Sequence, residues 1–256
     1  MDIQAFLFDL NGVFYEDNKI INGANEIISL LRKNKIPYKF ISNNSTLPRK
    51  FFVEKLIKIG LDIKENEVYT ANYAGVLMLK KLKLKNCKLI LNEIAKQDYK
   101  IFLRGEKKVD AIIIGDIGTK WDYNLMNELM DDIFNGARII ALHKGKYYQS
   151  QGKLKIDCGA FISGLEYVTS KKALVVGKPN KNFFELVTND WDFSNICIVG
   201  DDHTNDIMGG LKMGFKTILV RTGKYRQELY RNSKFKADYC IESISNLKSI
   251  IHDLRF

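Results

Sequence analysis

Four short polar stretches hold the residues of this chain whose types and spacing could do chemistry. They read DLNG at 9–12, SNNST at 42–46, GKP at 177–179 and GDDHTND at 200–206, and each follows an apolar run of strand type. Together they contain carboxylates, amides, hydroxyls and a lysine. Brought to one place, these groups suit a divalent metal ion and a phosphate group.

The candidate metal ligands are Asp9, Asp201 and Asp206. Hard oxygen ligands at this density suit Mg²⁺, which commonly binds through one or two carboxylates plus substrate phosphate. Ser42, the backbone amides after it and Lys178 would surround the remaining phosphate oxygens. In this arrangement Asp9 is the natural nucleophile, and an aspartyl-phosphate would form and then be hydrolysed.

Each stretch taken alone also has a purely structural explanation. An aspartate after a strand, such as Asp9, is often a turn or helix-cap residue. Residues 42–45 can cap a helix that begins near Pro48, Lys178 can be an ordinary loop lysine, and residues 201–202 can form a solvated turn. The occurrence of all four stretches in this order, each at a strand end, favours a site.

The elements that must position these residues alternate along the chain. Amphipathic stretches such as Ala24–Asn34 and Pro48–Gly60 separate apolar strand-type runs. Such alternation predicts an α/β fold with a parallel sheet covered on both faces, and ligands bind such sheets outside the carboxyl ends of the strands. The predicted strands are Ala5–Leu10, Tyr38–Ser42, Val109–Ile114, Arg138–Leu142, Ala173–Val176, Ile196–Val199 and Thr217–Val220.

The segment between the second and third polar stretches is too long for one crossover connection. It has its own alternation of strand and helix, which predicts a second domain inserted into the first. We therefore expect a discontinuous core domain of residues 1–72 and 173–256 and an inserted α/β domain of residues 73–172.

The composition, with 46% hydrophobic and 11% aromatic residues, suits a globular protein with a sizeable core. No apolar run approaches the roughly eighteen residues that a membrane span needs, and the first residues lack the layout of a signal peptide. The four cysteines stand far apart without a CxxC pair, which favours buried, reduced thiols. We therefore expect a cytoplasmic protein without a membrane partner.

The formal net charge of +10 admits two explanations. The lysines are spread widely, which favours a solvated surface that attracts anionic substrates. The alternative is nucleic-acid binding through clusters such as KKLKLKNCK at 80–88, but the chain contains no nucleic-acid recognition motif. We expect a small phosphorylated substrate and no nucleic acid.

The polar stretches also resemble a known family. FLFDLNGV, FISNNS, VVGKP and CIVGDDHTNDIMGG resemble, in order, the four motifs of the haloacid dehalogenase superfamily, whose members are mostly Mg²⁺-dependent phosphatases. The long insertion resembles the α/β cap of its class IIA branch. The resemblance implies a Rossmann-like parallel-sheet core with an inserted α/β cap domain.

Further stretches resemble one subgroup of this superfamily. ALHKGKYYQSQGKL, GLEYVTSKKALVVGKPNKNFF and ILVRTGKYR are similar to the subgroup that contains phospholysine phosphohistidine inorganic pyrophosphate phosphatase and haloacid dehalogenase-like hydrolase domain-containing protein 2. The similarity extends over nearly the whole chain, including the cap.

The resemblance implies a role for each matching residue. Asp9 would be nucleophile and metal ligand, with the backbone carbonyl of Asn11 and Asp201 as further ligands and Asp206 holding metal-bound water. Lys178 would bridge the nucleophile and the phosphate. The residues implied to bind phosphate are Ser42, Asn43 and Asn44.

Asn11 is the one departure from the family pattern. Most phosphatases of the superfamily have Asp two residues after the nucleophile, where it protonates the leaving group and later deprotonates the attacking water. Asn11 can do neither, and general acid–base catalysis is typically worth ~10²–10⁴-fold. We therefore expect a preference for leaving groups that need little protonation: pyrophosphate, phosphoramidates, and aryl or acyl phosphates. The alternative is a weakened catalyst that serves as a phosphate-ligand binding or regulatory protein.

Specificity is expected in the cap. Lys144 and Tyr147, in the stretch HKGKYYQSQ at 143–151, could frame an anionic or aromatic substrate, or belong to an ordinary exposed hairpin that turns at Gly152. The resemblance also implies a homodimer formed through the cap.

Overall fold

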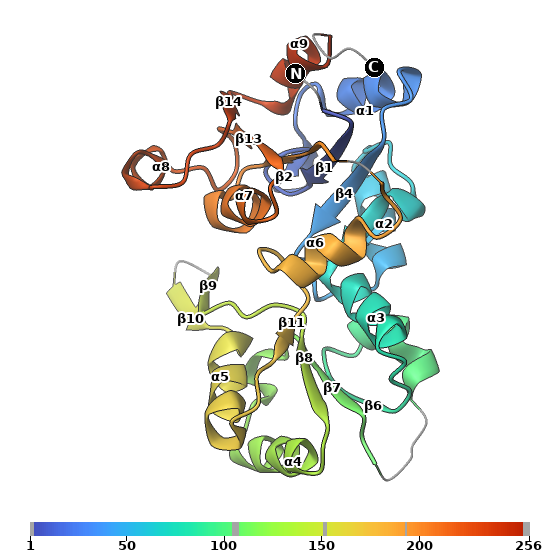
Figure 1. Ribbon diagram of the computed structural model, residues 1–256, viewed down its shortest axis with the longest axis vertical. Helices are drawn as coiled ribbons and strands as arrows, with labels where there is room; N and C mark the ends of the chain where they lie inside the picture. Colours follow the sequence, from blue (N-terminus) through green and yellow to red (C-terminus); the bar gives the residue numbers. More distant parts are fainter. Residues whose placement is uncertain (1–2, 104–107, 151–152, 193, 253–256) are drawn as a thin grey trace. The chain divides into compact units, whose positions relative to one another are not determined.

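The computed structural model describes residues 3–103, 108–150, 153–192 and 194–252 (Figure 1). Contacts divide the chain into two compact units. The core unit comprises Met1–Ser42, Lys50–Tyr69 and Lys178–Phe256, and the inserted unit comprises Asn43–Arg49 and Thr70–Gly177. The domain bounds predicted above, residues 1–72 with 173–256 and residues 73–172, stay a prediction.

The core unit is built on a six-stranded sheet in the order β14-β13-β12-β1-β4-β5. Neighbouring strands from β14 to β4 pair in parallel. All five residues of β1 are buried. The strands are β1 (Ala5–Asp9), β4 (Tyr38–Ser42), β5 (Val68–Thr70), β12 (Ile196–Gly200), β13 (Lys216–Val220) and β14 (Tyr239–Ile241).

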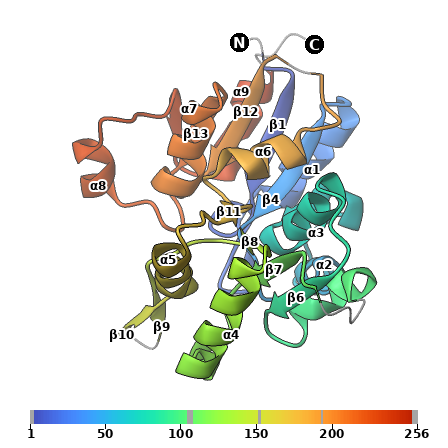
Figure 2. The same cartoon turned by 60° about the horizontal axis from the view of Figure 1, so that its bottom comes forward.

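Helices cover both faces of this sheet; in Figure 2, α6 lies in front of the strands and α9 behind them. On the buried side of α1, Ile27, Ile28 and Leu31 are inaccessible, as its apolar spacing predicts. The helices are α1 (Ala24–Lys33), α2 (Arg49–Lys58), η1 (Glu65–Glu67), α6 (Lys181–Val187), η4 (His203–Met208), α7 (Gly209–Lys212), α8 (Gln227–Asn232), η5 (Ile244–Asn246) and α9 (Leu247–His252). A small antiparallel pair, β2 (Tyr15–Glu16) and β3 (Lys19–Ile20), follows β1.

The inserted unit has a separate four-stranded parallel sheet in the order β11-β8-β7-β6. Its core joins this sheet to two helices through buried residues such as Ile112, Leu129 and Ile162. The strands are β6 (Cys87–Ile90), β7 (Ala111–Ile114), β8 (Arg138–Ala141) and β11 (Leu174–Val175), and β9 (Tyr147–Ser150) pairs with β10 (Lys153–Ile156) as an antiparallel hairpin. The helices are α3 (Ala71–Lys81), η2 (Ala95–Phe102), η3 (Gly118–Lys120), α4 (Tyr123–Phe134) and α5 (Cys158–Thr169).

The predicted alternation of strands and helices with parallel sheets is confirmed. Each predicted strand is present, although four are shorter than predicted. Two end one residue early, at Asp9 and at Ala141, the run from Val109 begins its strand at Ala111, and the run from Ala173 pairs only over Leu174–Val175. The four cysteines are free, and Cys240 alone among them is half-buried rather than buried. Gln151 and Gly152, at the turn of the predicted hairpin, lie outside the described residues.

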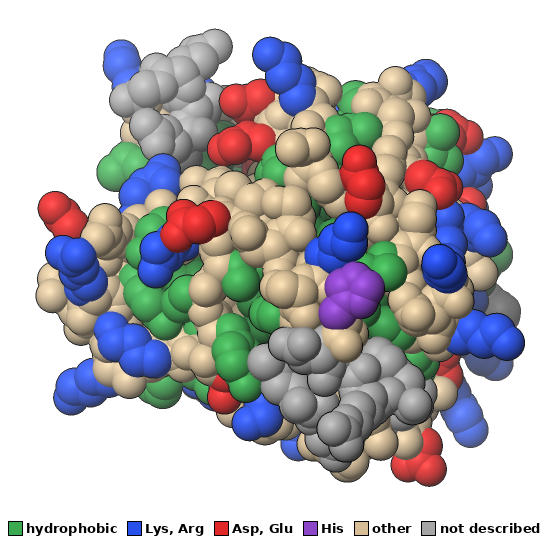
Figure 3. Space-filling model, turned by 90° about the horizontal axis from the view of Figure 1, so that it is seen from above, with side chains coloured by type: hydrophobic (Ala, Val, Ile, Leu, Met, Phe, Trp, Pro, Cys, Tyr) green, Lys and Arg blue, Asp and Glu red, His purple; other side chains and the backbone are tan. Residues whose placement is uncertain are grey.

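The distribution of surface charge and the lengths of the helices are relevant to nucleic-acid and membrane partners. Lys and Arg side chains on the face shown in Figure 3 are dispersed among acidic, apolar and neutral ones. This dispersal agrees with the solvated lysine-rich surface inferred from the sequence. No helix in the described ranges is both long and apolar enough to cross a bilayer.

Candidate active site

The register of the core sheet brings three of the predicted site residues to one edge. Asp9 is the last residue of β1 and lies opposite Ile41 of β4, so Ser42 follows at the same edge. On the other side of β1, Phe8 lies opposite Val199, which places Asp201 just beyond the carboxyl end of β12. Because parallel strands end at the same edge, residues distant in sequence become neighbours here.

Lys178 joins two of the carboxylates. Its Nζ lies 2.7 Å from Oδ1 of Asp9 and 2.6 Å from Oδ1 of Asp206. The lysine is 5% exposed, and Asp206 is fully buried. One ammonium therefore holds the carboxylates of two different strand ends in a fixed position inside the core unit.

Asp201 completes the acidic cluster. One carboxylate oxygen from each of Asp9, Asp201 and Asp206 lies within 4.8 Å of the others. Oδ2 of Asp201 accepts a hydrogen bond of 2.6 Å from the backbone N–H of Lys224. Its Oδ1 is buried and has no hydrogen-bond partner among the residues that the structure describes.

Two glycines make room for the Asp201 carboxylate. A Cβ at either Gly12 or Gly223 would lie 2.1 Å from Oδ2 of Asp201, closer than any real contact. Both have positive φ, 85° and 58°. The hydroxyl of Thr222 donates to the Gly12 carbonyl, so the loop after β13 is tied to the loop after β1 around this carboxylate.

A short helical turn positions Asp206. Residues His203–Met208 form a π-helical turn, which Asp202 caps by accepting from the N–H groups of Thr204 and Asn205. The N–H of Asp202 in turn donates to Oδ2 of Asp206 at 3.1 Å. A Cβ at Gly200 would lie 2.3 Å from the Asp206 side chain, so a glycine is required at the end of β12.

The electrostatics of the cluster favour a bound cation. Burial raises the pKa of Asp201 to about 7, and the Asp9 carboxylate adds to this shift. Burial also raises the pKa of Asp206 well above its ordinary value, because the opposing effect of Lys178 is smaller. For Lys178, burial lowers the pKa, but the carboxylates of Asp206 and Asp9 outweigh burial and hold the pKa above its ordinary value. The Lys178 ammonium thus lies among three carboxylates, and the Lys224 ammonium also acts electrostatically on Asp9 and Asp201.

These residues fit a divalent metal ion. The buried Oδ1 of Asp201 lacks a donor, and the donors of the cluster are all oxygens, which Mg²⁺ prefers. A dication would favour the ionised form of the buried carboxyl groups whose pKa burial raises. The composition of the cluster therefore supports metal binding at Asp9, Asp201 and Asp206.

Asn11 lies on the loop beside this cluster and is exposed. It bridges to Tyr15, and the neighbouring Gly12 N–H donates to the Tyr15 carbonyl at 2.7 Å. The Tyr15 phenol is buried, and burial together with the Asp9 carboxylate raises its pKa to about 12. Position 11 itself carries an amide, which does not titrate.

The other predicted site residues are distributed over the two units. Ser42 belongs to the core unit, whereas Asn43 and Asn44 belong to the inserted unit, where Asn44 accepts from the Leu47 N–H. Lys144 pairs with Glu166 at 2.6 Å inside the inserted unit. Tyr147 lies on β9 with 62% of its surface exposed.

Sequence reasoning missed several contributors to the cluster. Gly12, Gly223 and Lys224 approach Asp201 from loops far apart in the chain, and Asp202 acts through the turn that carries Asp206. A glycine in a loop gives no signal of the side chain it will contact. Gly12 and Asp202 stand inside two of the polar stretches, and the stretch RTGKYR at 221–226 follows a predicted strand, but none of these positions indicates a contact with Asp201 or Asp206.

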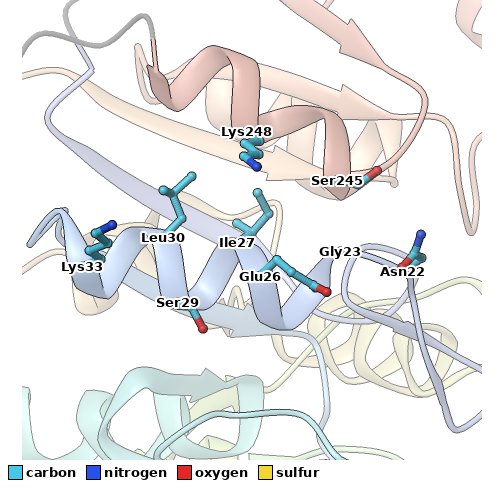
Figure 4. Close-up of a pocket in the computed structure, with 9 residues that line it drawn as sticks. All are labelled: Asn22, Gly23, Glu26, Ile27, Ser29, Leu30, Lys33, Ser245 and Lys248. Carbon is cyan, nitrogen blue, oxygen red and sulfur yellow. The ribbon is translucent and has the colours of Figure 1, made fainter.

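A separate pocket in the core unit lies between α1 and the segment that includes Ser245 and Lys248 (Figure 4). Ile27 and Leu30 of α1 point towards this segment. None of the residues that line the pocket belongs to the acidic cluster. The cluster, rather than this pocket, is the candidate active site.

Comparison with known proteins decides the family. A family model described as haloacid dehalogenase-like hydrolase matches residues 6–112, and a second, described as HAD-hydrolase-like, matches residues 175–247. The mouse (Mus musculus) haloacid dehalogenase-like hydrolase domain-containing protein 2 is 32% identical over 88% of this chain and 86% of its own. The chain belongs to the haloacid dehalogenase-like hydrolase family.

One further relative supports this membership, and a solved structure shows the same fold. Phospholysine phosphohistidine inorganic pyrophosphate phosphatase from Xenopus laevis is 30% identical over 97% of this chain and 94% of its own. The solved structure of 4-nitrophenylphosphatase from Thermotoga maritima shares the fold, with a TM-score of 0.85 at 24% identity over 96% of this chain and 97% of that one. The predicted haloacid dehalogenase fold, family and phosphatase type of enzyme are confirmed.

Proposed function

We propose that this haloacid dehalogenase-like protein is a Mg²⁺-dependent phosphohydrolase that acts on small phosphorylated substrates through an aspartyl-phosphate on Asp9. The observation that carries the proposal is the buried cluster in which Lys178 lies 2.7 Å from Asp9, with Asp201 and Asp206 beside it. The cluster places a candidate nucleophile beside a cation that offsets its charge and beside oxygen donors that would suit a metal ion.

In the first step an Asp9 carboxylate oxygen attacks phosphorus, and the bond from phosphorus to the leaving group breaks. Lys178 stabilises both the carboxylate and the incoming phosphate by its charge. Asp9, Asp201 and the backbone carbonyl of Asn11 would hold Mg²⁺ directly, with Asp206 holding its water. The metal would supply Lewis-acid stabilisation of the charge that develops on phosphate.

In the second step water attacks the phosphorus of the aspartyl-phosphate, which releases inorganic phosphate and regenerates Asp9. Ser42, Asn43 and Asn44 would orient the phosphate by donating hydrogen bonds. Asn11 can donate a hydrogen bond but cannot transfer a proton, so the general acid–base contribution of ~10²–10⁴-fold is absent at this position. The leaving group must therefore depart without full protonation.

This limitation predicts the substrate class. Pyrophosphate and aryl or acyl phosphates carry leaving groups that are stable with little protonation, whereas a sugar or glycerol alkoxide is not. The nitrogen of a phosphoramidate is basic enough to take its proton from solvent before the P–N bond breaks, so it needs no acid from the protein. The name of the Xenopus relative includes inorganic pyrophosphate, phospholysine and phosphohistidine, which agrees with this preference. Lys144 and Tyr147 remain candidates for contacts to the rest of the substrate.

The proposal is tested with p-nitrophenyl phosphate, pyrophosphate, imidodiphosphate and glycerol phosphate, each with Mg²⁺ and with EDTA. We expect Mg²⁺-dependent turnover of the first three and little of the fourth. Asp9→Asn should abolish turnover, and Asp17→Asn, which changes an exposed aspartate of the same unit, should retain it. Turnover that survives Asp9→Asn would refute the nucleophile.

The exposed amide of Asn11 also favours a second candidate, a phosphate-ligand binding or regulatory protein on the same fold. In that case the purified protein would bind Mg²⁺ and phosphate but hydrolyse none of the four compounds. A cytoplasmic location and a homodimer formed through the inserted unit stay predictions.

A further inference from the structure

A second group of metal-ligating side chains lies wholly within the inserted unit. His143 follows β8, whereas Asp157 and Cys158 stand at the start of α5. One potential ligand atom from each lies within 4.8 Å of the other two. Neither the polar stretches of the sequence nor the proposed phosphatase mechanism uses these residues.

The distances within the group are those of ligands around one small ion. Sγ of Cys158 lies 3.6 Å from Nδ1 of His143, and Nδ1 lies 3.6 Å from Oδ2 of Asp157. Tetrahedral Zn²⁺ with the usual bond lengths separates sulfur from nitrogen by about 3.6 Å and nitrogen from carboxylate oxygen by about 3.4 Å. Sγ is almost as close to Nε2, at 3.7 Å, so a rotation of the imidazole about its Cβ–Cγ bond would direct either nitrogen at the ion.

The backbone holds the three residues in place. The Gly159 N–H donates to the Gly145 carbonyl and the Asp157 N–H to the Lys146 carbonyl, both at 3.1 Å. Two glycines permit this approach: a Cβ at Gly145 would lie 2.1 Å from Oδ2 of Asp157, and a Cβ at Gly159 would lie 2.2 Å from the Gly145 carbonyl oxygen. Oδ1 of Asp157 accepts from the Cys158 N–H at 2.6 Å, which leaves Oδ2 directed towards His143.

The group is mostly buried, but its histidine is partly exposed. Cys158 is 1% exposed, whereas the His143 side chain retains 17% of its surface and offers a route for an ion. Burial and the Asp157 carboxylate raise the pKa of the Cys158 thiol, which argues against a free thiolate nucleophile. A further carboxylate, Asp116 after β7, acts electrostatically on the same thiol.

The donor set differs in kind from that of the core unit. One sulfur, one imidazole nitrogen and one carboxylate oxygen suit a borderline-soft ion such as Zn²⁺, whereas Mg²⁺ takes oxygen donors. We propose that His143, Asp157 and Cys158 form a second metal site, for a thiophilic divalent transition-metal ion of the Zn²⁺ class. Bound metal links the segment after β8 to the start of α5 within the inserted unit.

The site is tested by optical titration of the EDTA-treated protein with Co²⁺ in excess Mg²⁺. We expect about one equivalent of Co²⁺ to produce a near-ultraviolet charge-transfer band of a cobalt–thiolate bond, and Zn²⁺ to displace it. Co²⁺ at the all-oxygen cluster of the core unit cannot produce this band, so the readout is independent of the proposed phosphatase site.

Variants assign the ligands. Cys158→Ser should abolish the band, and His143→Gln should weaken Co²⁺ binding by more than about 10-fold. Cys87→Ser, which changes another buried cysteine of the inserted unit, should leave the band unchanged. Circular dichroism of the metal-free proteins checks that each variant folds.

Two outcomes would overturn the site. The first is the absence of a cobalt–thiolate band from the folded wild-type protein at saturating Co²⁺, which would show without any variant that Cys158 does not bind the ion. The second is a band that persists in folded Cys158→Ser. A wild-type protein that shows the cobalt–thiolate band but hydrolyses no phosphate compound would count against the proposed function only.

Discussion

The raised pKa of Asp201 predicts an unusual dependence of stability on pH in the metal-free protein. The pKa of this carboxyl is about 7 in the folded state and lies near its ordinary value of about 3.8 in the unfolded state. Between these two values the folded state binds more protons than the unfolded state. The contribution of Asp201 to the free energy of unfolding is therefore fully present below about pH 3.8 and is lost as the pH rises through about 7.

The magnitude follows from the two pKa values. One pKa unit corresponds to about 1.4 kcal/mol, and linkage between pKa values of about 3.8 and 7 gives a loss on the order of 2–3 kcal/mol in the free energy of unfolding between pH 5 and pH 8. Asp201 is 1% exposed, so solvent screening does little to reduce the effect. A divalent cation at the cluster favours the ionised carboxylate, so Mg²⁺ should stabilise the protein more at pH 8 than at pH 5.

The assay is urea-induced unfolding in EDTA at pH 5 and pH 8, for the wild type and for Asp201→Asn. The amide can still accept from the Lys224 N–H but does not titrate, so the variant should lose stability by an amount on the order of 2–3 kcal/mol less than the wild type over this interval. The comparison removes the titration of all other groups that the variant leaves unchanged. Equal pH dependence of the two proteins would refute the reasoning.

Three further predictions concern neighbouring residues. Asn11→Asp should raise kcat/KM for glycerol phosphate at least 10-fold more than for p-nitrophenyl phosphate, because only the poor leaving group needs the proton; equal gains would contradict this. Lys178→Met should lower the free energy of unfolding at pH 8 in EDTA by about 3–5 kcal/mol, measured with urea, because it leaves buried carboxylates unpaired; a loss below about 1 kcal/mol would contradict it. Gly12→Ala should weaken Mg²⁺ binding in calorimetry at least 10-fold, because its Cβ would lie 2.1 Å from Oδ2 of Asp201. Gly214→Ala, which also has positive φ but nothing within 4 Å, should bind Mg²⁺ as the wild type does.

Much of the fold was predictable because its signals are local. The continuous apolar run at β1 and the spacing of Ile27, Ile28 and Leu31 in α1 each identify an element from adjacent residues. Strands such as β5 and β14, with three residues each, were missed because so short a run has no distinct period. Their position in the sheet depends on pairing with strands elsewhere in the chain.

The acidic cluster was also predictable in part: the sequence identified its residues but not their contacts. Asp9, Lys178, Asp201 and Asp206 were identified from their places after strands, and the structure brings their side chains together. Their roles in metal and phosphate binding stay predictions. The second group, around Cys158, was not identified, because nothing local distinguishes its histidine and cysteine from ordinary core residues.

The sequence by itself determined which residue types stand at the strand ends, and therefore that the nucleophile candidate Asp9 has an amide, Asn11, two residues later. Only the tertiary structure decided which atoms meet: Lys178 with two carboxylates 169 and 28 residues away, and Gly12 and Gly223 against the same oxygen of Asp201. The physical reason is that strand periodicity and residue type act over a few neighbours. Burial, charge pairing and the shifted pKa of Asp201 arise only when distant strand ends meet at one buried edge of a sheet.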